Sequence, residues 1–112
     1  MPYVHLRTDR TLGKEELVEL RRAIIENLAH HLSKSPDRCM IQIDAEQCVV
    51  LGDEGKCAFA EVRVRGRFDT AVSEAFAAAV KRDVAAQLGL ETDRVYLHML
   101  ETQDGEIRSC FY

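Results

Sequence analysis

The sequence has no tryptophan, only two prolines, and no CxxC motif among its four cysteines. Without a CxxC pair, a thioredoxin-like redox site is not expected. No run of roughly 18 apolar residues occurs, so the sequence predicts no membrane-spanning helix. An excess of positive charge is also missing, because the net charge is −4. This balance argues against a general binder of nucleic acid or of an anionic membrane.

The cysteines and histidines are spread along the chain in spacings that match no zinc motif. They are Cys39, Cys48, Cys57 and Cys110, and His5, His30, His31 and His98. We expect no metal ion, and we interpret the cysteines as reduced side chains of a cytoplasmic protein. The N-terminus lacks the basic and apolar segments of a signal peptide, which agrees with that location.

The sequence does contain enough apolar residues for one hydrophobic core, and it contains an internal repeat. The 46% hydrophobic and 30% charged residues suit one globular domain over residues 1–112. Asp-Arg at 37–38 and again at 93–94 precedes an alternating segment, and the two dipeptides are half the chain length apart. The chain therefore is predicted to contain two copies of one unit, residues 1–56 and 57–112.

Each copy is predicted to be strand, helix, strand. In the first copy, period-two alternation predicts strands at 3–8 and 39–44 around a helix at about 14–32. In the second copy the predicted strands are 60–65 and 95–100. Between them a helix capped by Asp69 or Thr70 is predicted to end at Gly89.

Two such units predict an α+β fold, a duplicated β-α-β unit forming a four-stranded mixed sheet with two helices on one face. One layer of helices leaves the other sheet face open. That face is predicted to carry Tyr3, His5, Met40, Phe59, Arg63, Arg65, Tyr96 and His98. Self-association is the simplest way to cover it, and it would bring residues of different subunits together.

The opening Met-Pro has two interpretations. Proline has no backbone N–H, and Pro2 is tolerated as the first residue of a strand because no N–H is needed there to bond the neighbouring strand. Alternatively, removal of Met1 leaves Pro2 as the N-terminus, with a free secondary amine.

Four segments together resemble the tautomerase superfamily, and within it the macrophage migration inhibitory factor and phenylpyruvate tautomerase-like family. They are the initial Met-Pro, "SKSPD" at 33–37, "CAFAEVRVRG" at 57–66 and "DRVYLHM" at 93–99. The resemblance implies a homotrimer with active sites between subunits, no cofactor, and removal of Met1 to leave Pro2 as the catalytic base. An α-amino group titrates at about 7.7–8.0. Burial or a nearby cation favours its neutral form, which can move a proton α to a carbonyl.

The resemblance also suggests substrate-binding residues, each with a structural alternative. Lys34 matches the lysine that meets the substrate carboxylate, or it is an ordinary solvent lysine. Tyr96 matches a pocket tyrosine of the neighbouring subunit, or it packs at the interface. His98 stands where the animal cytokine has asparagine, and would donate to a substrate oxygen or serve the interface.

Arg65 departs from the family, because the animal cytokine has an apolar residue there. Its guanidinium can bind a carboxylate with two hydrogen bonds. Arg63, Arg65 and Arg67 alternate, so they share one side unless Gly66 bends the strand. The alternative for this row is a solvated face or an intersubunit salt-bridge strip. The tail "DGEIRSCFY" lacks the tryptophan and asparagines of the relatives, which leaves substrate preference open.

The predicted function is a cofactor-free keto–enol tautomerase, an isomerase of a small 2-oxo acid such as phenylpyruvate. Two alternatives stay open. One is a hydratase, dehalogenase or decarboxylase in which protonated Pro2 acts as an acid. The other is a non-catalytic trimeric binding protein on the same scaffold.

Overall fold

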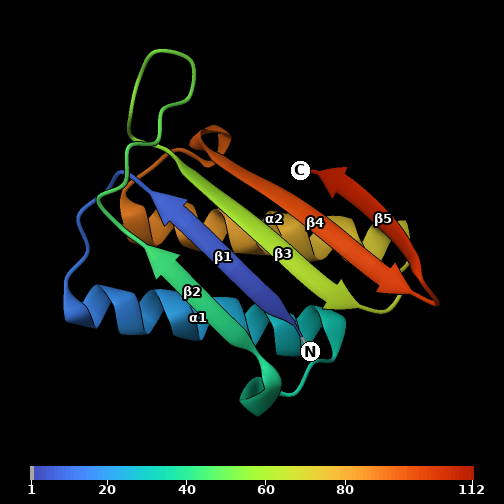
Figure 1. Cartoon of the computed structure of the whole chain (residues 1–112). Helices are drawn as coiled ribbons and strands as arrows, with labels where there is room; N and C mark the ends of the chain where they lie inside the picture. The colour runs from blue at the N-terminus through green and yellow to red at the C-terminus, as the bar shows by residue number, and fades with distance from the viewer. Residues whose placement is uncertain (1) are drawn as a thin grey trace.

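The computed structural model describes residues 2–112. Along the chain lie β1 (Tyr3–Thr8), α1 (Lys14–Leu32), β2 (Met40–Asp44), β3 (Ala58–Arg65), α2 (Thr70–Leu88), β4 (Val95–Gln103) and β5 (Glu106–Phe111). Short 3₁₀ helices, η1 (Pro36–Arg38) and η2 (Thr92–Arg94), lead into β2 and β4. The strand–helix–strand order predicted for both copies is confirmed (Figure 1).

The strands form one mixed sheet in the order β2-β1-β3-β4-β5. β1 and β2 are parallel, β3 and β4 are parallel, and β1 runs antiparallel to β3. Both helices lie on the same side of this sheet (Figure 1). The predicted mixed sheet with two helices on one face is therefore confirmed.

The predicted count of four strands is one too few. The tail returns antiparallel to β4, with Gln103 opposite Glu106. Asp104 and Gly105 connect the two strands with positive φ angles of 54° and 81°. Asp-Gly favours this type of tight hairpin turn, because glycine adopts positive φ without a steric cost. The alternation in β5 is weak, since most of its side chains are exposed, and so the strand was not predicted.

The core lies between the helices and the facing side of the sheet. The apolar stripe of α1 and that of α2 bury against alternate residues of β1, β3 and β4. Its largest fully buried side chains are Phe76, Leu6, Leu20, Ile24, Leu28, Leu97 and Met99. Burying one such side chain stabilises the fold by about 1.5–3 kcal/mol. None of the helices in residues 2–112 is long and apolar enough to cross a membrane.

The two copies are related by an approximate two-fold axis. His5 in β1 lies opposite Glu61 in β3, and these residues are equivalent in the two copies. On the helix side Asn27 donates to a carboxylate oxygen of Asp83 at 2.8 Å, across a separation of 56 positions. An axis that passes through both pairs superposes each copy on the other.

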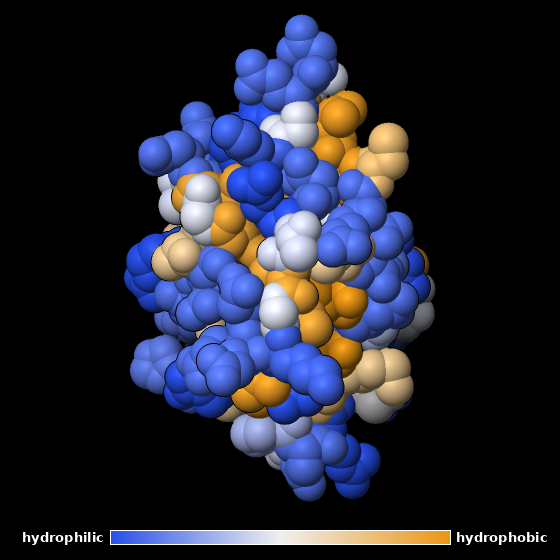
Figure 2. All heavy atoms as spheres, turned by 90° about the vertical axis from the view of Figure 1, so that its left-hand side faces the viewer, coloured by the Kyte–Doolittle hydropathy of each residue, from blue (hydrophilic) through white to orange (hydrophobic). Residues whose placement is uncertain are grey.

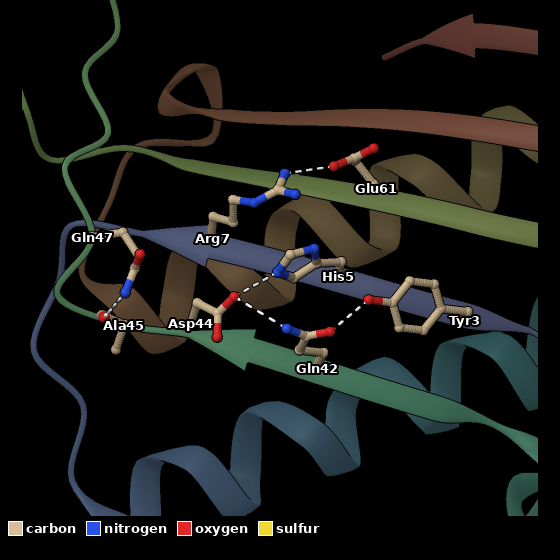
Figure 3. A network of polar contacts seen from close by, with 8 residues as sticks. All are labelled: Tyr3, His5, Arg7, Gln42, Asp44, Ala45, Gln47 and Glu61. Atoms are coloured by element: carbon tan, nitrogen blue, oxygen red, sulfur yellow. Dashed lines mark hydrogen bonds and ion pairs between the residues drawn. The ribbon is translucent and has the colours of Figure 1, made fainter.

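The open face of the sheet carries a row of polar contacts (Figure 3). Tyr3 donates to Gln42 at 2.6 Å, and Gln42 in turn donates to Asp44 at 3.3 Å. His5 Nε2 lies 2.6 Å from the same Asp44 carboxylate. The side of the molecule at the left of Figure 1 is also largely hydrophilic, with an irregular apolar strip between hydrophilic residues (Figure 2). Polar contacts therefore line the part of the open sheet face that β1 and β2 form.

Candidate active site

A cavity of about 240 Å³ lies at the start of β1. Pro2, Ser33, Lys34, Ser35 and Arg38 line it. Because β1 and β2 are parallel, the chain must return from the end of α1 to the edge of the sheet where β1 begins. This return brings the residues of the cavity together. The amide of Met40 donates to the carbonyl of Pro2 at 2.9 Å, which fixes the buried Pro2 beside this turn.

Lys34 follows directly after the end of α1. Ser33 ends the helix in the left-handed region with a φ of 55°, and the amide of Lys34 donates to the carbonyl of Leu28. The ammonium donates to the carbonyl of Arg65 at 2.7 Å and lies 5.5 Å from the ring centroid of Phe68. An ammonium has three donors, so donors remain for a ligand.

Arg65 contributes to this corner through its backbone. It is the last residue of β3, and the pairing of Arg63 with Tyr3 places the end of β3 beside the start of β1. The Arg65 side chain is exposed on the open face of the sheet. Gly66 follows with a φ of 124°, a conformation that other residues rarely adopt, and β3 ends there. The predicted row of alternating arginines therefore ends before Gly66, and Arg67 does not continue the alternation of Arg63 and Arg65.

Behind Lys34, a buried carboxylate holds Phe68. Glu101 is only 2% exposed, and it accepts a hydrogen bond from the Phe68 amide at 2.8 Å. Arg108 of β5 donates to both Glu101 oxygens at 2.7 Å and to the Phe68 carbonyl at 2.7 Å. The hydrogen bond to Glu101 raises the pKa of Arg108. The pair ties the β4–β5 hairpin to the loop under Lys34.

Tyr96 and His98, both in β4, do not line the Pro2 cavity. Tyr96 pairs with Phe59, which pairs with Arg7, five residues along β1 from Pro2. At about 3.3 Å per residue, the separation along the sheet is about 16 Å. His98 stacks on Phe111 with ring centroids 4.1 Å apart. One chain therefore brings together Pro2, Lys34 and the backbone of Arg65, but not Tyr96 or His98.

A second cavity, of about 230 Å³, lies at the start of β3. Its lining includes Tyr96 and Arg94, and apolar residues of the preceding loop and β3. Cys57 also lines it, and burial raises the pKa of this thiol. A protonated thiol is a poor nucleophile, so this cavity offers no activated cysteine.

Three contributors to the site were not predicted from the sequence. Arg38 lines the Pro2 cavity, and Glu101 with Arg108 positions the loop behind Lys34. Glu101 carries a sequence signal, because it stands at the apolar phase of its strand, in step with Val95 and Met99. An ionisable residue at such a position requires a buried partner.

Within residues 2–112, no group of three or more His, Cys, Asp or Glu side chains could hold a metal ion. Met1 lies outside the described residues, and with it the predicted removal of that residue.

The fold and the cavity define the class of protein: two β-α-β units around an approximate two-fold axis, with a cationic cavity where the first strand begins. A scan against family profiles matches residues 1–108 to the macrophage migration inhibitory factor (MIF) profile. The chain belongs to the MIF family. A search of curated proteins found no match to the sequence.

Solved structures share the fold at low sequence identity. MIF2 of Leishmania major has a TM-score of 0.83 at 15% identity, over 96% of this chain and 97% of its own. Pt0534 inactivated by 2-oxo-3-pentynoate has a TM-score of 0.80 at 12% identity, over 89% and 85%. A fused 4-OT described as a symmetric trimer has a TM-score of 0.72 at 17% identity, over 90% and 84%.

Proposed function

We propose that this protein is a cofactor-free tautomerase that interconverts the keto and enol forms of a small 2-oxo acid. The observation that carries the proposal is that Pro2 and Lys34 line one cavity. With Met1 removed, the Pro2 nitrogen is a secondary amine that takes a proton from the carbon next to the 2-oxo group. It delivers that proton to the carbonyl oxygen to give the enol, and in the reverse direction it takes the enol proton and delivers it to the carbon. Lys34 binds the carboxylate through the donors that Arg65 does not use.

The charges around the cavity favour a base over an acid. Nearby positive charge favours the neutral form of an amine. Lys34 and Arg38 both line the cavity, so Pro2 would have two cations beside it. This supports tautomerisation over the alternative chemistry in which a protonated proline acts as the acid. The pH profile separates the two, because activity that rises as the amine loses its proton indicates a base.

The proposed active form is a homotrimer in the cytoplasm. Five apolar side chains are strongly exposed on β2, β4, β5 and the loop between the copies: Met40, Tyr96, Ile107, Phe111 and Val50. Exposure of this kind supports burial against other copies. A trimer would let Tyr96 and His98 serve the Pro2 cavity of a neighbouring subunit, which agrees with their distance from it within one chain. The trimeric 4-OT fold supports the same assembly.

The direct test uses purified protein whose mass shows that Met1 is absent. Loss of enol-phenylpyruvate absorbance should be much faster than without enzyme, and Pro2→Gly should slow it by at least about a hundredfold. Sedimentation and circular dichroism of the variant should match those of the parent. A Pro2→Gly protein as active as the parent would refute the mechanism. Failure of the parent with every 2-oxo acid tried would favour the non-catalytic alternative.

A further inference from the structure

Two arginines at equivalent positions of the two copies have different partners. Arg94, at the end of η2, donates to backbone carbonyls of the 51–56 loop, the shortest bond reaching Gly55 at 2.7 Å. Arg38, at the end of η1, has no side-chain hydrogen bond or ion pair to any of residues 2–112. The arginine at this position therefore holds a loop in the second copy, whereas in the first copy its side chain makes no hydrogen bond or ion pair with the residues that the structure describes.

Arg38, whose guanidinium has no hydrogen-bond partner among residues 2–112, lines the cavity that Pro2 and Lys34 also line. The residues that line this cavity include two cationic side chains and no Asp or Glu. Cations without a carboxylate partner, in a concave site, attract anionic ligands. A guanidinium can hold a carboxylate with two parallel hydrogen bonds, which fixes the direction of the carboxylate as well as its place.

We propose that Arg38 is a specificity-determining residue that binds a second carboxylate, and that the substrate is a small 2-oxo diacid. This inference rests on the proposed tautomerase function and adds the class of substrate. Lys34 holds the carboxylate beside the 2-oxo group, and Arg38 holds the carboxylate at the other end. The cavity of about 240 Å³ suits a short diacid, since drug-sized ligands occupy roughly 300–1,000 Å³.

The test compares two enols that differ in one group. Oxaloacetate and phenylpyruvate share the 2-oxo acid, and the first has a carboxylate where the second has a phenyl ring. Arg38→Gln should raise KM for enol-oxaloacetate about ten- to a hundredfold, as expected for loss of a charge-assisted bond. The KM for enol-phenylpyruvate should change less than about threefold. Arg38→Lys should restore part of the preference, because the charge remains but the bidentate geometry does not.

Arg82→Gln is the matched control. It removes the same charge from the groove between α1 and α2, which shares no lining residue with the Pro2 cavity and where Arg82 is largely exposed beside Asp83. This variant should leave both KM values unchanged. An equal effect of Arg38→Gln on the two enols, or no effect on either, overturns the assignment.

Binding of two inert analogues keeps this inference separate from the function itself. Malate and phenyllactate have the same two end groups but a 2-hydroxyl, so they cannot tautomerise. Calorimetry should show malate binding more tightly than phenyllactate, with the difference lost in Arg38→Gln. If this holds while the parent turns over no enol, the tautomerase proposal fails and the diacid site stands. If enols turn over but Arg38→Gln does not weaken malate, the diacid site fails alone.

Discussion

The two copies share a backbone unit but differ at the point where each first strand begins. In the first copy, β1 begins next to Pro2, and the cavity there is lined by Lys34 and Arg38. In the second copy, β3 continues from Cys57, and the cavity is apolar apart from Arg94 and Tyr96. Asp9 accepts hydrogen bonds from the amides of Lys56 and Cys57, which fixes the chain before β3.

The comparison shows what a duplicated unit needs in order to acquire chemistry. Both copies place a cavity beside an arginine that ends a short 3₁₀ helix. In the second copy the connecting loop covers that position and binds the arginine. In the first copy no side-chain hydrogen bond or ion pair from residues 2–112 engages Arg38, so its guanidinium is available to a ligand of the cavity.

The largest effect is expected from blocking the Pro2 nitrogen, because an amide there makes the start of β1 resemble the start of β3, where the chain continues. A chain extended before Pro2, so that its nitrogen is an amide, should fold and assemble normally. Its kcat/KM should fall by about 10²–10⁴-fold, the usual contribution of a general base. Activity should return when a protease removes the extension. Full activity in the extended chain would mean that Pro2 is a structural strand residue.

Lys34 has an apolar counterpart, Leu90, in the second copy. Lys34→Met makes the two positions alike and removes one charge-assisted bond to the substrate carboxylate. We expect KM to rise about ten- to a hundredfold with little change in kcat, because the bond serves ground and transition states equally. Steady-state kinetics measures this. A fall in kcat at constant KM would instead assign Lys34 to the chemical step.

Replacing each equivalent arginine by alanine should affect stability in one copy only. Arg94→Ala leaves several carbonyls of the 51–56 loop without their donor, and should lower the free energy of unfolding by about 1–3 kcal/mol. Arg38→Ala should change it by less than about 0.5 kcal/mol, as an exposed substitution does. Urea unfolding of both variants gives the comparison. Equal losses would show that Arg38 also has a structural role.

The smallest expected effect is a pH dependence from Asp9. Burial acts to raise its pKa, but hydrogen bonds from the amides of Lys56 and Cys57 outweigh it and hold the pKa below the usual 3.8. A lowered pKa gives stability that is present above 3.8 and is lost as pH falls through the lower, folded-state value. Asp9→Asn should therefore flatten the decline of the melting temperature below about pH 4. An unchanged slope would assign that decline to other carboxylates.

The repeat made most of the fold predictable from the sequence. Alternation in the strands, helical spacing and the stop at Gly89 predicted both β-α-β units, because the packing in each unit is local and periodic. The fifth strand was missed for a physical reason. β5 pairs through its backbone and exposes most of its side chains, so it lacks the apolar alternation that marks a buried strand.

The candidate site was less accessible to sequence analysis than the fold. The Met-Pro start and Lys34 could be named from the family resemblance. Arg38 could not, since nothing in "SPDR" distinguishes it from its counterpart Arg94, which binds a loop. Its role depends on whether a neighbouring segment reaches it, and that is a property of the folded chain. Tyr96 and His98 stay predictions, because their proposed role needs a second subunit.

The central claim is that the Pro2 nitrogen is the reactive group, and covalent labelling tests it most directly. The 2-oxo-3-pentynoate that inactivates Pt0534 is an electrophilic alkyne attached to a 2-oxo acid. If this protein binds 2-oxo acids as proposed, we expect the alkyne to add to the Pro2 amine. After incubation with active protein, peptide mass spectrometry locates the label. We predict one adduct per chain, on a peptide that begins at Pro2 and lacks Met1, formed in step with the loss of activity. Loss of activity with the label on Lys34 or a cysteine, or full activity in protein that retains Met1, would contradict the claim.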